Sequence, residues 1–88
     1  MGFRIELSDK AKKQLKKLDK SQARIIAKWI DKNLVGTANP RISGKALTGK
    51  FKSFWRYRVG DYRIIAEIKD AVVTILIIDI DHRSSVYL

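Results

Sequence analysis

The chain has 88 residues, no cysteine and a single histidine. This length fits one small domain, residues 1–88, because a second core would have too little apolar material. The absence of cysteine excludes a disulfide scaffold and thiolate chemistry, and one histidine argues against a transition-metal site built from protein ligands. We therefore expect neither a metal nor a cofactor.

The charge is strongly basic: 19 Lys and Arg face 9 Asp and Glu, which gives a net charge of +10. Such an excess favours nucleic acid, an acidic protein or an anionic membrane surface as partner. The basic residues are spread over the whole chain, and the apolar run 71–78 is far shorter than the ~20 residues of a spanning helix, so we expect no membrane. The first residues do not resemble a signal peptide, and we expect a cytoplasmic protein.

Residues 3–7 alternate apolar and charged side chains and predict a short strand. Ser8 is a good N-cap for a first helix, and Asp19 or Ser21 opens a second helix that ends near Gly36. Together these segments predict an antiparallel helical hairpin over residues 8–35. The lysines of the first helix, among them Lys13 and Lys17, read as a solvated face that is also available to RNA phosphates.

The second half of the chain predicts three strands after one long connection. Residues 36–50 are polar and contain several glycines, so they form the connection, and strands follow at about 53–59, 62–69 and 72–82. The order β-α-α-β-β-β indicates an α+β domain. We expect the N-terminal strand and the helical hairpin to pack on one face of a mostly antiparallel four-stranded sheet.

Gly60-Asp61 lies between two stretches rich in aromatic and β-branched residues, which is typical of a tight β-hairpin. A two-residue loop places Arg58 directly opposite Arg63, and Arg56 lies on the same face two residues away. Like charges opposed across a ladder destabilise it by a few tenths up to roughly 1 kcal/mol. Three guanidinium groups on one sheet face therefore predict a bound anion, and phosphate fits best.

The same alternation assigns the faces of the hairpin. One face is expected to be covered by the helices, and it carries Trp55, Tyr57, Val59, Tyr62, Ile64, Ala66 and Ile68. The opposite face is expected to be open and basic, and it carries Phe54, Arg56, Arg58, Arg63, Ile65 and Glu67. We expect the second face to be the working surface.

Several motifs in fixed order resemble the RelE/ParE superfamily of type II toxin–antitoxin toxins, and the RelE-like mRNA interferases in particular. They are Lys45-Ala-Leu-Thr-Gly49, Trp55-Arg-Tyr-Arg-Val-Gly-Asp-Tyr-Arg63 and His82-Arg83-Ser-Ser-Val-Tyr87. The resemblance covers nearly the whole chain. It implies a metal-independent, ribosome-dependent endoribonuclease that cuts mRNA in the A site, where the RNA 2′-hydroxyl attacks the adjacent phosphate.

The resemblance also implies the roles of individual residues. Arg63 and Arg58 would stabilise the transition state, for which the guanidinium fork is well shaped. Arg83 would contact phosphate, and Tyr87 would stack on a base or donate a proton. The predicted catalytic set is Arg56, Arg58, Arg63, His82, Arg83 and Tyr87, and the predicted RNA-binding set is Lys45, Lys50, Lys52, Lys13 and Lys17.

The chain departs from the best-known members of the family on the first hairpin strand. Where they place lysines, this sequence has Phe54 and Arg56. Arginine does not readily act as a base, since its pKa exceeds 12. His82 is the one side chain whose unperturbed pKa lies near neutrality, and Lys50 and Lys52 are the alternatives for the general base.

Two other functions stay open at this point. A ParE-type inhibitor of DNA gyrase uses the same fold without needing the His82-Arg83 and Tyr87 ending. A basic module that binds RNA or the ribosome without catalysis would fit the missing lysines. For the toxin, we expect a monomer held inactive by a RelB-like antitoxin with an acidic, partly disordered segment that folds over the basic face or displaces the C-terminal residues.

Overall fold

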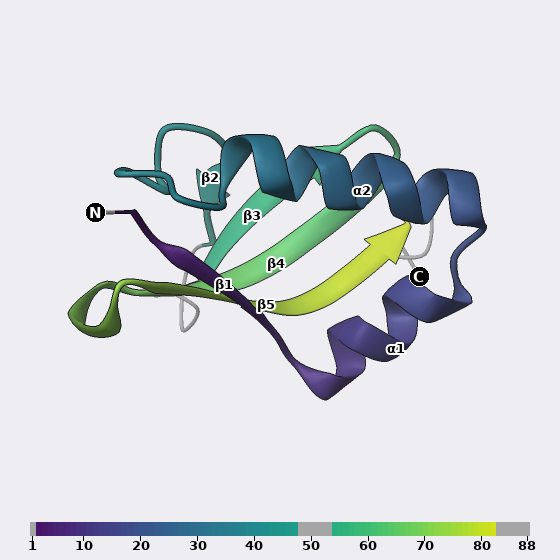
Figure 1. Ribbon diagram of the computed structural model, residues 1–88, viewed down its shortest axis with the longest axis horizontal. Coiled ribbons are helices and arrows are strands. Elements are labelled where there is room, and N and C mark those ends of the chain that lie inside the picture. Colours follow the sequence, from purple (N-terminus) through teal and green to yellow (C-terminus); the bar gives the residue numbers. More distant parts are fainter. Residues whose placement is uncertain (1, 48–53, 83–88) are drawn as a thin grey trace.

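The computed structural model describes residues 2–47 and 54–82 (Figure 1). In chain order the elements are β1 (Arg4–Leu7), α1 (Asp9–Lys17), α2 (Lys20–Asn33), β2 (Lys45–Ala46), β3 (Phe54–Val59), β4 (Tyr62–Lys69) and β5 (Thr74–His82). The strands form one sheet in the order β1-β5-β4-β3-β2, in which β1 is parallel to β5 and the other neighbours are antiparallel. The predicted α+β class is confirmed. The sheet has a fifth strand, because β2 forms within the expected connection.

The hydrophobic core lies between α2 and one face of the sheet. Ile26, Ile30 and Leu34 recur at helical spacing, and all three are buried. They belong to one cluster with the strand residues Tyr57, Val59, Ile64, Ala66, Ile75, Ile77 and Ile80. Figure 1 shows α2 lying across the sheet above these strands. We call this side of the sheet the core face.

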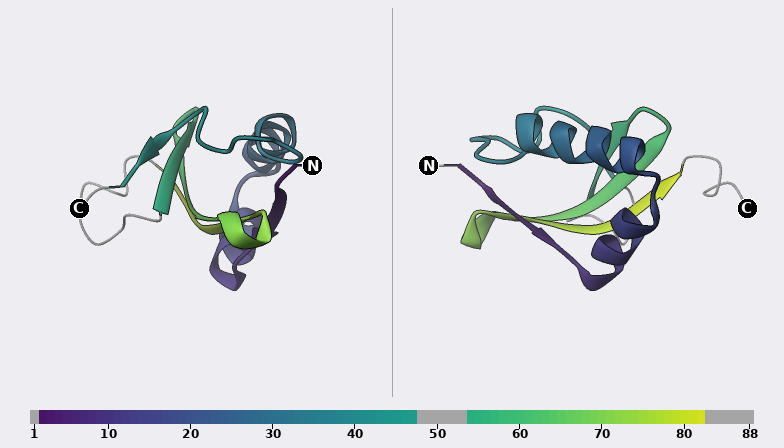
Figure 2. Two further views of the ribbon diagram at one scale, coloured as in Figure 1. Left: turned by 90° about the vertical axis from the view of Figure 1, so that its left-hand side faces the viewer. Right: turned by 45° about the vertical axis from the view of Figure 1, so that its right-hand side comes forward.

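Helix α1 lies beside β5, beyond the point where β1 ends (Figures 1 and 2). The Ser8 hydroxyl caps α1 by accepting from the Ala11 N–H at 3.0 Å, and it donates to the Ile78 carbonyl at 2.9 Å. One turn further, the Gln14 side-chain oxygen accepts from the Ile80 N–H at 2.7 Å. The side chains of Ser8 and Gln14 therefore satisfy backbone groups of β5 that β1 is too short to reach.

The connection between α2 and β3 is fixed by two aromatic side chains. The Tyr57 hydroxyl donates to the Pro40 carbonyl at 2.6 Å, and the Trp55 indole N–H donates to the Ser43 carbonyl at 2.7 Å. Burial raises the pKa of Tyr57 to about 12, so its hydroxyl stays protonated as a donor. Arg41 forms a bidentate ion pair with Asp70 at 2.8 and 3.0 Å, and this hydrogen bonding lowers the pKa of Asp70.

The turn between β4 and β5 sets where β5 begins. Asp70–Val72 form a 3₁₀ turn, and Val73 follows with a left-handed φ of 49°. The strand starts at Thr74, two residues later than predicted, because the apolar pattern of Val72 and Val73 does not reveal the left-handed residue. Among the described residues, no helix is long and apolar enough to cross a membrane.

Candidate functional site

The β3–β4 hairpin has the predicted register. Val59 pairs with Tyr62 around Gly60-Asp61, and Arg58 lies directly opposite Arg63. In such a hairpin the first pair exchanges both backbone hydrogen bonds, so the next pair is a non-hydrogen-bonded one, with Cα atoms about 4.5 Å apart and close side chains. Gly60 has a φ of 59°, which glycine adopts without strain.

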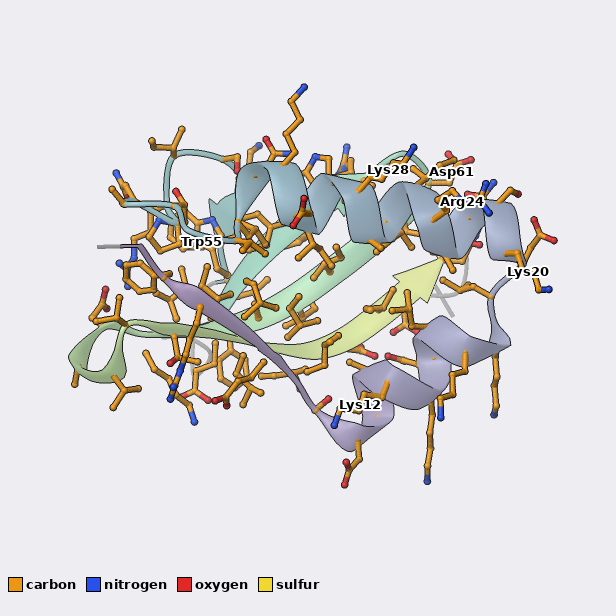
Figure 3. The ribbon with its side chains drawn as sticks, in the orientation of Figure 1. Lys12, Lys20, Arg24, Lys28, Trp55 and Asp61 are labelled. Carbon is orange, nitrogen blue, oxygen red and sulfur yellow. The ribbon has the colours of Figure 1, made fainter. Side chains whose placement is uncertain are left out.

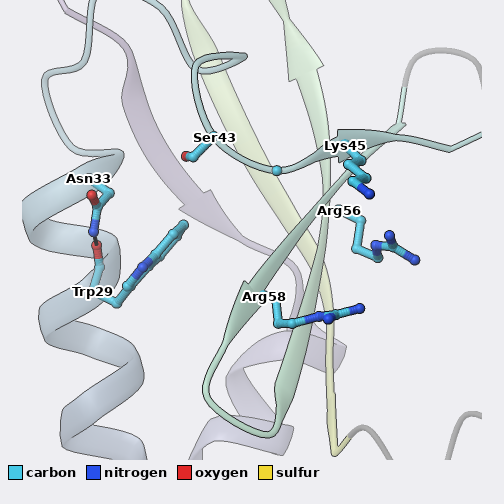
Figure 4. Close-up of a pocket in the computed structure, with 7 residues that line it drawn as sticks. Trp29, Asn33, Ser43, Lys45, Arg56 and Arg58 are labelled. Atoms are coloured by element: carbon cyan, nitrogen blue, oxygen red, sulfur yellow. Dashed lines mark hydrogen bonds between the residues drawn. The ribbon is translucent and has the colours of Figure 1, made fainter.

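The predicted open side of the hairpin carries the arginines, and we call it the arginine face. It consists of Phe54, Arg56, Arg58, Arg63, Ile65 and Glu67, on the side away from the core cluster. Lys45 of β2 pairs with Arg56, and Figure 4 shows Lys45, Arg56 and Arg58 projecting to the same side of β3. Within residues 2–47 and 54–82, none of Lys45, Arg56, Arg58 and Arg63 forms an ion pair. These four cations are therefore available to an anionic ligand.

A cleft lies beside these cations, between α2, the loop before β2, and β3 (Figure 4). It has a volume of about 450 Å³ and is lined by Trp29, Asn33, Ser43, Gly44, Lys45, Arg56 and Arg58. The loop before β2 approaches β3 closely at Gly44, where an added Cβ would lie 2.4 Å from the Arg56 carbonyl oxygen. Trp29 packs on Tyr57 with ring centroids 5.5 Å apart. The cleft thus joins an aromatic wall to the basic edge of the arginine face.

Arg63 has a second neighbour that the sequence did not suggest. On β5, Asp81 pairs with Arg63, while His82 pairs with Tyr62. The His82 ring meets Tyr62 edge-on, with centroids 5.1 Å apart. Because adjacent strand residues point to opposite faces, Asp81 shares the arginine face with Arg63, and His82 lies on the side of Tyr62. The predicted general base His82 and the predicted catalytic residue Arg63 therefore lie on opposite faces of the sheet.

A β-bulge in β5 determines this placement. Ile65 pairs with Asp79 and Ala66 with Ile77, so Ile78 has no partner on β4. Ile75 and Ile77 face the core, and without the bulge strict alternation would turn Asp79 and Asp81 inward as well. The bulge instead buries Ile80, which is 3% exposed, and turns both carboxylates outward. Because Ile77 and Ile78 are both apolar, the sequence does not show that the alternation of inward and outward side chains shifts by one residue here.

Asp79 and Asp81 form a carboxylate pair held by α1. The Gln14 amide nitrogen lies 2.6 Å from Asp79 Oδ1 and 3.3 Å from Asp81 Oδ1, and Lys10 Nζ lies 3.4 Å from Asp79. The hydrogen bond that protonated Asp81 donates to Asp79, together with burial, raises the pKa of Asp81. Burial opposes ionisation of Asp79 too, but hydrogen bonds from Asp81, Gln14 and Lys10 outweigh it and lower the pKa of Asp79. Of the two carboxyl groups, Asp81 therefore loses its proton at the higher pH.

The remaining predicted residues are distributed as follows. Lys13 and Lys17 are exposed on α1, and further basic side chains, Lys20, Arg24 and Lys28, follow the outer side of α2 (Figure 3). Lys50, Lys52, Arg83 and Tyr87 lie outside the described residues, so their roles stay predictions. In the part of the chain that is described, no group of three or more His, Cys, Asp or Glu side chains is placed to hold a metal ion.

Comparison with known proteins now identifies the class. Residues 5–87 match the family model described as ParE toxin of type II toxin–antitoxin system, parDE. The chain therefore belongs to this toxin family, within the RelE/ParE superfamily, as the sequence motifs predicted. The comparison with curated proteins finds no match.

Solved structures with the same fold include RelE toxins. The RelBE2 toxin–antitoxin complex from Mycobacterium tuberculosis has a TM-score of 0.84 and 24% identity, covering 96% of this chain and 94% of that chain. The isolated E. coli RelE toxin has a TM-score of 0.76 and 22% identity, covering 98% and 92%. The RelE–RelB complex from Pyrococcus horikoshii has a TM-score of 0.69 and 23% identity, covering 94% and 97%. The fold is thus that of RelE toxins.

Proposed function

We propose that this toxin is a ribosome-dependent endoribonuclease that cleaves mRNA in the A site. The observation that carries the proposal is the Arg58–Arg63 pair, with Arg56 beside it, on the side of the hairpin away from the described core cluster. This arrangement destabilises the free hairpin, and a phosphate between the guanidinium groups would reverse the penalty.

The chemistry uses the RNA's own nucleophile. The 2′-hydroxyl attacks the adjacent phosphorus, the bond to the 5′-oxygen breaks, and negative charge accumulates on the phosphorane between these events. Fixed cations act most strongly where charge develops, and Arg58 and Arg63 are already positioned before substrate arrives. Lys45 and Arg56 would bind the neighbouring phosphates through the sequence-independent electrostatic attraction.

An antitoxin is the second partner we propose. Relatives are solved as RelBE and RelE–RelB complexes, and a net charge of +10 calls for an acidic partner. We expect a RelB-like segment, partly disordered when free, that covers the arginine face or displaces the C-terminal residues. A complex in which Arg63 and Tyr87 both stay open and unmoved would contradict this mode of inhibition.

The test of the nuclease is primer extension on an mRNA in a purified translation mixture, with and without ribosomes. We expect discrete cuts with ribosomes alone, and their loss in Arg63→Ala. Arg24→Ala removes the same charge from the outer side of α2 and should retain the cuts. Intact mRNA with the wild-type protein under both conditions would exclude the proposal.

The family description favours one other candidate, a ParE-type inhibitor of DNA gyrase. A supercoiling assay with purified gyrase separates the two functions. Inhibited supercoiling together with intact mRNA would establish the gyrase inhibitor, and cleaved mRNA with normal supercoiling would exclude it.

A further inference from the structure

We propose that Asp81 accepts the proton of the attacking 2′-hydroxyl and so acts as the general base. Strand β3 contains no lysine that could take this role. This inference rests on the proposed nuclease function and adds to it a residue that the sequence motifs did not indicate.

The first support is position. Asp81 is the β5 partner of Arg63 on the arginine face, so Arg63 has Arg58 on one side and this carboxyl group on the other. A phosphate held by the two arginines would therefore lie one strand away from the carboxylate, and a cross-strand neighbour is within reach of side chains. The described alternative, His82, extends from the side of Tyr62.

The second support is the bulge at Ile78. Bulges often re-aim a side chain next to an active site, and this one turns Asp79 and Asp81 from the core to the arginine face. With Ile78 present, the bulge keeps both carboxylates out of the core, where their burial would be costly. It also leaves Asp81, and not an apolar side chain, opposite Arg63.

The third support is the surroundings of the carboxyl group. The charged groups that face Asp81 are Asp79 on its own strand, Lys10 from α1 and Arg63 from β4. Asp79 raises the pKa of Asp81, whereas Lys10 and Arg63 oppose this increase. Gln14 contacts both carboxyl groups and restrains the pair. Once ionised, a carboxylate with a raised pKa is a stronger base than a free one.

The proposed step balances without any cofactor. The ionised Asp81 carboxylate takes the proton of the 2′-hydroxyl as the 2′-oxygen–phosphorus bond forms. The phosphorus–5′-oxygen bond breaks, and the leaving 5′-oxygen takes a proton from water. The products are a 2′,3′-cyclic phosphate and a 5′-hydroxyl, and Asp81 later returns its proton to solvent.

The experiment measures single-turnover cleavage of ribosome-bound mRNA against pH for the wild type and Asp81→Asn. We expect the wild-type rate to rise with pH until Asp81 is ionised. Asp81→Asn should cut at least about 10²-fold more slowly, without that rise, while binding ribosomes normally. Asp31→Asn, an exposed carboxylate on α2, is the matched control and should keep the wild-type profile. The rise should also persist in His82→Gln.

The outcomes separate this inference from the nuclease itself. If the wild-type protein never cuts mRNA, both the nuclease function and this inference are excluded. Cleavage by Asp81→Asn at the wild-type rate would overturn the inference and leave the nuclease standing. Faster cleavage by this variant would show that Asp81 weakens Arg63 electrostatically, and a wild-type rate that falls with pH would make Asp81 an acid; both results contradict the assigned role. Urea unfolding of each variant confirms that it is folded.

Discussion

Arg58 and Arg63 face each other across β3 and β4 as a close, non-hydrogen-bonded pair, and neither forms an ion pair with a described residue. Two guanidinium groups in this position repel one another in the free protein. Arg58 is the most exposed of the three arginines on this face. We therefore expect replacement of Arg58 to raise stability and weaken function most clearly.

We predict that Arg58→Thr stabilises the protein and weakens the toxin. Removing the like charge and introducing a β-branched residue should raise the free energy of unfolding by a few tenths to about 1 kcal/mol. Growth arrest after induction should weaken, because one cation of the phosphate site is lost. Urea unfolding and a growth curve measure the two effects. Arg24→Thr on α2 is the control, and a similar loss of toxicity there would show that net charge alone matters.

We predict that two glycines with similar backbone angles differ in how well they tolerate replacement by alanine. Gly44 has a φ of 80°, and its added Cβ would meet the Arg56 carbonyl oxygen at 2.4 Å. Gly36 has a φ of 76° but no atom within 4 Å of the added Cβ. Gly36→Ala should therefore lower the free energy of unfolding by about 1 kcal/mol, from backbone strain alone. Gly44→Ala should cost clearly more, and equal losses would contradict the close approach of the loop to β3.

We predict that Val73→Gly stabilises the chain. A β-branched residue with a φ of 49° is strained, and glycine relieves this strain at the cost of extra freedom in the unfolded state. The expected net gain is roughly 0.5–1 kcal/mol in thermal or urea unfolding. The neighbouring Val72→Gly, in the 3₁₀ turn, should destabilise the chain. A loss of stability in both variants would count against the left-handed turn.

We predict that Asp81→Asn and Asp79→Asn change stability in opposite directions near neutral pH. The folded-state pKa of Asp81 is raised, so the folded state binds its proton more tightly than the unfolded state does. Ionised Asp81 therefore destabilises the fold as pH rises above the unfolded pKa of about 3.9, and Asp81→Asn should remove this penalty. At acidic pH, below the unfolded pKa, the benefit should vanish.

The effect of ionisation on stability has the opposite sign for Asp79. Its pKa is lowered, so its contribution to stability is present above the unfolded pKa and is lost as pH falls through the folded value. Asp79→Asn should therefore destabilise the protein at neutral pH. Urea unfolding at pH 3 and pH 7 measures both variants. Shifts of the same sign at pH 7 would contradict the opposite pKa shifts of the two carboxyl groups.

The sequence was sufficient for the hairpin and its two faces. Gly60-Asp61 fixed the loop length, and strict alternation then placed Arg58 opposite Arg63 and Tyr57 in the core, as the structure confirms. Local rules decide both features, and for that reason they were predictable.

The remaining features depend on interactions that no local pattern encodes. Strand β2 has only Lys45 and Ala46, and it pairs because Gly44 lets its loop approach β3. The bulge at Ile78 depends on how β5 pairs with β4, which the residues of β5 do not reveal by themselves. The faces on which Asp79, Asp81 and His82 lie could therefore not be predicted. Helical spacing gave the core positions of α2, but it gave no sign that Gln14 would contact β5.

The bulge also predicts how the chain should respond to changes in length. Strand β5 contains one more residue than its pairing with β4 uses, and that residue is Ile78. Deleting Ile78 would join Ile77 directly to Asp79 and restore plain alternation, with Asp81 still opposite Arg63. Deleting Ile80 instead would leave a polar side chain where the core needs an isoleucine. A single-residue deletion should therefore be tolerated at Ile78 far better than at Ile80, although both remove the same amino acid from the same strand.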